Sequence, residues 1–205
     1  MKMVRQTAGD WIIQTSFPAG AVVRPAETDD VNAIAMIYGH HVQHGTASFE
    51  TEPPTAEQMG ERRALLLSQG YPYLVAERDG KVIGYAYASA FRPRAAYRDT
   101  VENSVYLRPD MMGLGIGSLL LEALIRACEV RGFRQMVAVV GDIANAPSIR
   151  LHERHGFRLV GTVRSVGHKG TGSTLCCSRE RLAMATVRLR CGAMPAVFPQ
   201  LEGSP

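Results

Sequence analysis

The feature that most constrains this chain is a turn of alternating glycines, Gly113, Gly115 and Gly117, between a strand-like segment and an amphipathic, helix-like segment. Small residues at these positions leave the backbone N–H groups at the start of the helix uncovered. Those first-turn amides have no acceptor inside the helix, and the positive end of the helix dipole lies there. The turn therefore predicts an anion site, and a pyrophosphate would make it a site for a nucleotide-type cofactor.

Three kinds of glycine turn can be compared with it. The phosphate loop of nucleoside triphosphatases requires Gly-Lys-Ser/Thr, and no Lys follows these glycines, so that class is excluded. The dinucleotide fingerprint stays open, because the next predicted strand, residues 135–141, leads to the acidic Asp142. That fingerprint normally occupies the first βαβ unit, whereas this turn lies in the middle of the chain. The third alternative is a turn that only lets a strand and a helix pack closely.

Composition restricts the class of protein. The 205 residues fit one domain with a sizeable core, and 46% hydrophobic with 20% charged residues is ordinary for a globular protein. The net charge of +4 is mild, and no Lys/Arg stripe alternates with aromatic residues, so we expect no nucleic-acid partner. No apolar run approaches membrane-spanning length, so we expect no membrane partner. Four cysteines without a disulfide-framework spacing fit a reduced cytoplasm.

The chain divides into three parts. Residues 1–20 lack the pattern of a signal peptide and are expected to form a poorly ordered extension, or to reflect a mis-assigned start. Residues 21–169 are expected to form one α/β (α+β) domain with the order β-α-α-β-β-β-α-β-α-β, a mixed sheet covered by helices. Residues 170–205 form an atypical tail without clear periodicity. The predicted strands cover residues 22–24, 73–78, 81–88, 100–108, 135–141 and 157–167, and the predicted helices end near Gly45, Gly70, Gly132 and Gly156.

Three motifs follow one another in the chain: Arg108-Pro-Asp, the glycine turn, and the segment 145–157, which starts with Asn-Ala-Pro-Ser and ends with Gly-Phe. Together they resemble the GNAT superfamily of N-acetyltransferases. Further motifs resemble the phosphinothricin acetyltransferase group within it. These are Arg24-Pro-Ala, Thr46-Ala-Ser-Phe-Glu, Phe91-Arg-Pro-Arg-Ala-Ala-Tyr, Thr100-Val-Glu-Asn-Ser-Val-Tyr and Arg150-Leu-His-Glu. The resemblance covers about residues 22–169.

The resemblance implies a GNAT fold, with a mixed, mostly antiparallel central sheet flanked by helices and with splayed strands at an acetyl-CoA site. Acetyl-CoA would be the co-substrate, with its pyrophosphate on the glycine turn and its pantetheine arm along the preceding strand. The residues implied to bind it are Val105, Tyr106, Leu107, Gly113, Leu114, Gly115, Ile116, Gly117, Ser118 and Asn145.

Acetyl transfer to an amine needs a base for the amine, a polarised thioester and a way to accommodate the leaving thiolate. Strand alternation puts Glu102 on one face with Ser104 and Tyr106, in an otherwise sheet-forming run. From this pattern a base and a solvated strand residue are equally good interpretations, and the resemblance favours the base. His152 stands where many GNAT enzymes have a Tyr that protonates the thiolate, and a His with a near-neutral pKa can do the same. A packing or surface His is the alternative.

The resemblance implies an acceptor site formed by Phe49, Arg92, Arg94 and Tyr97. Guanidinium groups suit a carboxylate or phosphinate on the acceptor, although exposed loop arginines are the usual alternative. The trio His40, His41 and His44 has no Cys or carboxylate at ligand spacing. We interpret it as a set of helix-end residues that favour the dipole, and we expect no metal.

Two features depart from the family pattern. Met112 stands where the family usually has a basic or amide residue, so a side-chain contact to phosphate is lost and weaker acetyl-CoA binding is expected. After Lys169, the family's last-strand pattern is replaced by Gly170-Thr-Gly-Ser-Thr-Leu-Cys-Cys. A displaced reading of the codons for Ser173-Thr-Leu-Cys-Cys can restore Asp-Thr-Val-Leu. We therefore hypothesise a frameshift near Lys169, which would remove the last strand and open a sheet edge.

The sequence thus predicts a cytoplasmic, homodimeric N-acetyltransferase that moves acetyl from acetyl-CoA to the primary amine of a small amino-acid-like acceptor. By resemblance, the acceptors are of the phosphinothricin, methionine sulfoximine or methionine sulfone type. One alternative is the same fold acting on a polyamine or a protein N-terminus, which an acidic acceptor groove would favour. Another is an acetyl-CoA-binding remnant without turnover, which Met112 and the altered tail favour.

Overall fold

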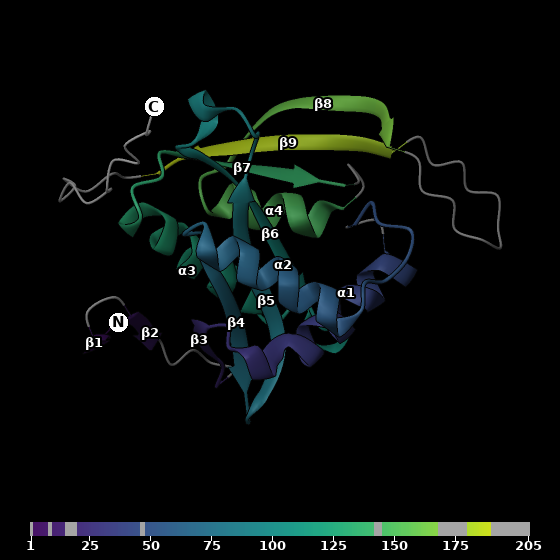
Figure 1. Cartoon of the computed structure of the whole chain (residues 1–205). Coiled ribbons are helices and arrows are strands. Elements are labelled where there is room, and N and C mark those ends of the chain that lie inside the picture. Colours follow the sequence, from purple (N-terminus) through teal and green to yellow (C-terminus); the bar gives the residue numbers. More distant parts are fainter. Residues whose placement is uncertain are drawn as a thin grey trace, which may run out of the picture.

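A seven-stranded sheet forms the centre of the molecule, with helices on both faces (Figure 1). The computed structural model describes residues 2–7, 10–14, 20–45, 48–141, 145–167 and 180–189. The strand order is β3-β4-β5-β6-β7-β9-β8, and each neighbouring pair is antiparallel except β6 with β7, which is parallel. The predicted mixed, mostly antiparallel sheet is confirmed. Its strands are β3 (Val22–Pro25), β4 (Tyr73–Arg78), β5 (Lys81–Ala90), β6 (Thr100–Leu107), β7 (Gln135–Val140), β8 (Arg158–Gly167) and β9 (Glu180–Arg188).

Among the described residues, four α-helices cover this sheet: α1 (Val31–His44), α2 (Ala56–Ser68), α3 (Ile116–Val130) and α4 (Ala146–Arg154). Side chains of α1 and α2 pack on one face, and those of α3 and α4 pack on the other. Short 3-10 helices span Thr28–Asp30, Ala95–Tyr97 and Pro109–Met111. Within the described ranges, every helix is too short or too polar to cross a bilayer.

Local sequence signals explain where several elements begin and turn. At the start of α2, Thr55 Oγ1 accepts a hydrogen bond from the Gln58 amide at 3.2 Å, and Gln58 Oε1 accepts one from the Thr55 amide at 2.9 Å. This is the predicted capping box, which satisfies two backbone donors reciprocally. Between β4 and β5, Asp79 and Gly80 have φ values of 52° and 70°. Positive φ at both central residues defines the two-residue hairpin turn that Asp-Gly predicts.

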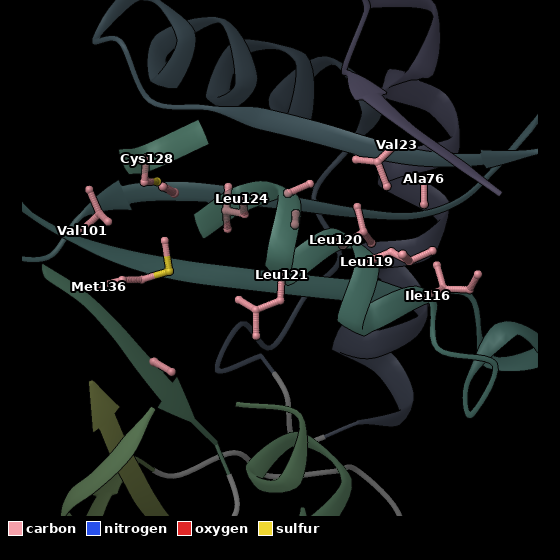
Figure 2. Packing of buried hydrophobic residues seen from close by; sticks show 14 of the residues in the cluster. Val23, Ala76, Val101, Ile116, Leu119, Leu120, Leu121, Leu124, Cys128 and Met136 are labelled. Carbon is pink, nitrogen blue, oxygen red and sulfur yellow. The ribbon is translucent and has the colours of Figure 1, made fainter. Parts of the chain in front are cut away.

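The core beneath α3 is built from apolar side chains at helical spacing. Ile116, Leu120, Leu124 and Cys128 recur every four residues on α3, and each is almost completely buried. Figure 2 shows them together with Val101 of β6 and Met136 of β7, with which they form one cluster. This packing fixes α3, and therefore the glycine turn at its start, against the central strands.

The opposite face of the sheet carries stacked tyrosines beneath α1 and α2. Ring centroids lie 5.1 Å apart for Tyr73 with Tyr87 and 5.3 Å apart for Tyr85 with Tyr106. Tyr38 of α1 meets the Tyr106 ring edge-on at 5.1 Å. Aromatic pairs at these distances stabilise neighbouring strands beyond their buried area. Glu102 lies on the same face of β6 as Tyr106, next to these rings.

The two ends of the described chain differ from the sequence-based expectations. Residues 1–20 were expected to be poorly ordered, whereas β1 (Lys2–Thr7) and β2 (Asp10–Gln14) pair as antiparallel strands. The segment contains β-prone residues such as Trp11, Ile12 and Ile13, which explains the pairing.

The tail after Lys169 was expected to lack the last strand if its reading frame is displaced. Instead β9 lies between β7 and β8 and pairs with both. Alternate residues Ala185 and Val187 pack against the core beneath α3, so a short period-2 pattern and two flanking strands suffice to order it. The segment Gly170–Cys177, on which the frameshift hypothesis depends, lies outside the described residues.

Candidate active site

The strands β6 and β7 separate halfway along their length. Parallel pairing joins Thr100–Asn103 of β6 to Gln135–Ala138 of β7, and the register between the two strands ends there. Beyond this point β6 continues to pair with β5, and β7 continues to pair with β9. We call the two diverging strand ends, residues 104–107 of β6 and 139–140 of β7, the prongs, and both line one pocket of about 980 Å³. We call the point of separation the fork. The fork leaves room for a ligand between two strands of the sheet.

The glycine turn opens into the same pocket. Gly113 and Gly115 have φ values of 76° and 82°, a conformation that favours glycine, and Gly115 caps the start of α3. Apart from the adjoining residues of the chain, no heavy atom lies within 4 Å of where a Cβ would stand at either residue, so the backbone there is open to a ligand. Gly113, Gly115, Gly117 and Ser118 line the pocket. The first-turn amides of α3 thus lie at one end of the pocket, in the arrangement that suits an anion.

The other predicted cofactor residues contribute in different ways. Val105, Tyr106, Leu107 and Asn145 line the pocket. Leu114 is 50% exposed, whereas Ile116 is buried in the core, and neither belongs to the pocket lining. Their side chains therefore lie outside the lining of this pocket, although the Ile116 amide belongs to the first turn of α3. The Asn145 side chain caps α4 by accepting a hydrogen bond from the Ser148 amide at 3.2 Å.

Glu102 lies on β6 at the fork and lines the pocket. Its cross-strand neighbours are Ser89 on β5 and Val137 on β7. The predicted alternation is confirmed, because Val101 and Val105 pack beneath α3 while Tyr106 packs on the other face. Burial raises the pKa of the Glu102 carboxyl above its ordinary value, and the positive charge of Arg92 opposes part of that shift.

His152 projects from α4 to the opposite side of the fork and is buried. Its Nδ1 lies 2.8 Å from the Ser148 carbonyl oxygen, and its Nε2 lies 3.1 Å from Oδ1 of Asn103. The Phe157 ring packs edge-on at 4.9 Å. Burial lowers the pKa of His152, the bond to Ser148 raises it, and nearby His155 lowers it. Both ring nitrogens are thus engaged within the protein.

The predicted acceptor residues are only partly brought together. Phe49 lines the pocket. Arg92, Arg94 and Tyr97 lie in the loop between β5 and β6, are exposed, and are not part of this pocket's lining. Arg92 stacks over Phe91 with its guanidinium carbon 5.1 Å from the ring centroid. Of the three loop residues, Arg92 alone has a described influence on the site, through its charge near Glu102.

A polar network at the acceptor end was not predicted from the sequence. The Tyr38 hydroxyl lies 2.9 Å from Oγ of Ser48 and donates to Oε1 of Glu50 at 2.9 Å. Arg62 of α2 forms an ion pair with the same carboxylate at 2.6 Å. Tyr87 hydrogen-bonds Ser104 on the neighbouring strand. Glu50 directly follows Phe49, which was predicted to lie at the acceptor site. This adjacency was the sequence signal from which Glu50 could have been predicted.

His41 lies in the last turn of α1, as its interpretation as a helix-end residue predicts. Its further contacts were not predicted: its Nε2–H donates to the Leu107 carbonyl at 2.7 Å, and its side chain lines the pocket. Because the partner is a carbonyl, Nε2 carries the proton. Its position fits the buried stripe of Ile34, Ile37 and Tyr38 on α1, a spacing signal that was available in the sequence. This hydrogen bond joins α1 to the C-terminal end of β6.

Known proteins match this arrangement. The model of the acetyltransferase (GNAT) family matches residues 34–157. A phosphinothricin N-acetyltransferase from Alcaligenes faecalis is 53% identical over 147 residues, which cover 72% of this chain and 75% of the relative. An L-methionine sulfoximine/L-methionine sulfone acetyltransferase from Pseudomonas aeruginosa is 40% identical over 153 residues, which cover 73% of this chain and 87% of the relative.

A solved structure agrees with these relatives. The GNAT superfamily phosphinothricin acetyltransferase from Sinorhizobium meliloti, in complex with acetyl-CoA, superposes with a TM-score of 0.78 at 41% identity, covering 90% of this chain and 96% of that one. This chain therefore belongs to the GNAT family of acetyltransferases. It is an acyltransferase, and its similarity to the phosphinothricin and methionine sulfoximine acetyltransferases confirms the resemblance inferred from its motifs.

Proposed function

We propose that this chain transfers acetyl from acetyl-CoA to the primary amine of a small amino-acid-like acceptor of the phosphinothricin, methionine sulfoximine or methionine sulfone type. The relatives with these named activities support the acceptor class. The observation that carries the proposal is Glu102, a half-buried carboxylate with a raised pKa at the fork of a pocket that also contains the glycine turn. Such a pocket holds a candidate base and a candidate anion site in one place.

The proposed function implies one direction for acetyl-CoA in the pocket. Its pyrophosphate would lie on the first-turn amides of α3 beside Gly113 and Gly115, where partial positive charge is exposed. Its pantetheine arm would then follow the β6 prong along residues 105–107, which line the pocket. That direction brings the thioester to the fork, between Glu102 on one side and His152 on the other.

Few protein groups take part in the proposed reaction. An acceptor amine is mostly protonated near neutral pH, and Glu102 takes its proton, directly or through a water. The free amine attacks the thioester carbonyl, whose oxygen a backbone amide of the β6 prong polarises. The C–S bond then breaks and CoA leaves as a thiolate. A thiol with a pKa of about 8.5 is a good leaving group, so the assistance of His152 is expected to matter less than the base.

A second candidate function is acetylation of a polyamine or a protein N-terminus. It is favoured by the acceptor end of the pocket, which is lined by two carboxylates, Glu50 and Glu102, whereas Arg92 and Arg94 lie outside the lining. The ion pair with Arg62 offsets the charge of Glu50, however, and the positive charge of Arg92 acts on Glu102, so the acceptor end carries at most one carboxylate for an amine. One carboxylate suits a single amine better than a polycation.

A thiol-release assay with acetyl-CoA separates these candidates. We expect methionine sulfone and phosphinothricin to be turned over with a higher kcat/KM than spermidine or a short peptide. If Arg92 reaches the acceptor's anionic group, Arg92→Gln raises the acceptor KM, while Arg98→Gln, which alters an exposed arginine of the same loop, leaves it unchanged. A preference for spermidine would support the second function, and binding of acetyl-CoA without turnover of any amine would indicate a remnant.

We further propose that the protein acts in the cytoplasm as a homodimer, without a metal, nucleic-acid or membrane partner. The family resemblance and the ordinary composition support this arrangement. Light scattering of the purified protein tests the dimer, because a monomer mass at micromolar concentration contradicts it.

Met112 provides a test of the cofactor site. It is 51% exposed and lines the pocket just before Gly113. We expect Met112→Arg to lower the KM for acetyl-CoA about two- to fivefold, since an exposed ion pair contributes about 0.5–1 kcal/mol. Met36→Arg places the same charge on the exposed surface of α1 and should leave the KM unchanged. Equal KM values for the wild type and Met112→Arg would contradict the placement of the phosphates.

A further inference from the structure

Asn103 occupies the fork itself. It is the last residue of β6 that pairs with β7, where it lies opposite Ala138. It is 6% exposed, and its side chain points to the face covered by α4, away from Glu102. A polar side chain buried at this depth requires hydrogen-bond partners.

The carboxamide of Asn103 joins three elements. Its Nδ2 donates to the Val137 carbonyl on β7 at 3.1 Å, and its Oδ1 faces Nε2 of His152 on α4 at 3.1 Å. The Val137 carbonyl can only accept, so it fixes the orientation of the amide and leaves Oδ1, an acceptor, toward the imidazole. The Nε2 position of His152 is therefore held by an acceptor whose direction the sheet determines.

The hydrogen-bond partners of His152 and its burial have opposite effects on the protonation of the ring. Ser148 O and Asn103 Oδ1 are both acceptors, so together they match a ring that carries protons on both nitrogens. Burial acts in the opposite direction, and His155 is the one charged group with a described effect on the ring. Asn103 thus supplies one of two contacts that favour the protonated form against desolvation.

We propose that Asn103 is a positioning residue of the transfer reaction: it sets the point at which β6 and β7 separate and holds the Nε2–H edge of His152 at the fork, where the CoA thiolate leaves. The inference rests on the proposed role of His152 in assisting that thiolate. In the proposed step, the Nε2–H of His152 breaks its hydrogen bond to Asn103 and forms one to the CoA sulfur as the C–S bond breaks. The proton then passes from Nε2 to sulfur.

The test uses three variants of the full chain. Asn103→Leu keeps the branched shape of the side chain, although it is bulkier, and removes both hydrogen bonds. His152→Phe removes the ring nitrogens, and the third variant combines the two substitutions. With acetyl-CoA and methionine sulfone, we expect each single variant to lower kcat about tenfold with little change in the KM for acetyl-CoA. Because the two residues act as a unit, the double variant should be no slower than the slower single variant. Additive losses overturn the proposal.

The pH profile separates positioning from simple structural support. If protonated His152 assists, kcat falls as pH rises through its pKa. Asn103→Leu removes an acceptor and should move this limb to lower pH, whereas Asn103→Asp strengthens the acceptor and should move it to higher pH. An unchanged limb in both variants overturns the proposal.

NMR titration of the imidazole provides a readout that does not depend on turnover. The pKa of His152 should fall in Asn103→Leu and rise in Asn103→Asp even if the acceptor class is wrong. Shifted titration without activity toward any amine would contradict the proposed function alone, whereas an unshifted titration in an active enzyme would contradict the role of Asn103 alone.

Discussion

Replacement of Glu102 by Gln is expected to lower kcat/KM for the acceptor amine by about 100-fold or more, the usual contribution of a positioned general base. Gln has nearly the same shape and cannot accept the proton. The exposed Glu61→Gln on α2 is the matched control and should leave kcat/KM unchanged. A Glu102→Gln variant within about threefold of the wild type would show that another group, or bulk water, takes the proton.

The pH dependence of the same reaction follows from the raised pKa of Glu102. The base must be ionised, so kcat/KM should fall as pH decreases through that pKa, above the range of an ordinary Glu. The residual activity of Glu102→Gln should lack this limb. A wild-type limb at the ordinary pKa of a solvated Glu would contradict the burial of the carboxylate.

Glu102→Gln should lower the activity of the protein without lowering the stability of its fold. Because burial raises the native pKa of Glu102, the native state holds this proton to higher pH than the unfolded state does. Stability is therefore lost as pH rises from the unfolded pKa through the native pKa, and ionised Glu102 is unfavourable at pH 8. Glu102→Gln should have a Tm at pH 8 at least equal to that of the wild type. A lower Tm would mean that lost activity reflects unfolding.

Truncation of Leu120 on α3 should have the largest effect on folding. Its side chain is completely buried between α3 and the sheet, and it is one of the contacts that fix the glycine turn. Leu120→Ala is expected to lower the free energy of unfolding by about 2–5 kcal/mol, through lost burial and the cavity left behind. For a chain of this size the Tm should fall by about 4–20 °C.

The matched control is Leu65→Ala on α2, the same change at a side chain that is 58% exposed. It should alter the free energy of unfolding by about 0.5 kcal/mol or less. Equal effects of the two substitutions in urea unfolding would contradict the assignment of the core. At low temperature, folded Leu120→Ala should still bind acetyl-CoA, since no pocket residue is changed.

Much of the fold could be predicted because its signals are local. The glycine turn, the Thr55 capping box and the Asp79-Gly80 hairpin each act within a few residues, and the observed order of elements between β3 and β8 follows the prediction. Strand alternation placed Glu102 and Tyr106 on one face correctly. These features depend on backbone geometry that neighbouring residues determine.

The remaining features depend on contacts between distant residues. The insertion of β9 between β7 and β8 requires two partners far apart in sequence, and the tail's own pattern is short. The Asn103–His152 contact spans 49 residues, and the bond of His41 to Leu107 spans 66. Sequence spacing does not reveal such pairs. The placement of Arg94 and Tyr97 at the acceptor site stays a prediction from family resemblance, since both side chains are exposed in a loop that is not part of the pocket lining.

Identification of the reaction product tests the central claim most directly. Wild-type protein is incubated with acetyl-CoA and methionine sulfone, and the products are examined by mass spectrometry and NMR while the released thiol is counted. We expect one acetyl group on the α-amine of the acceptor for each thiol released. Thiol release without an acetylated amine, or no transfer to any amine of the acceptor panel, would contradict it.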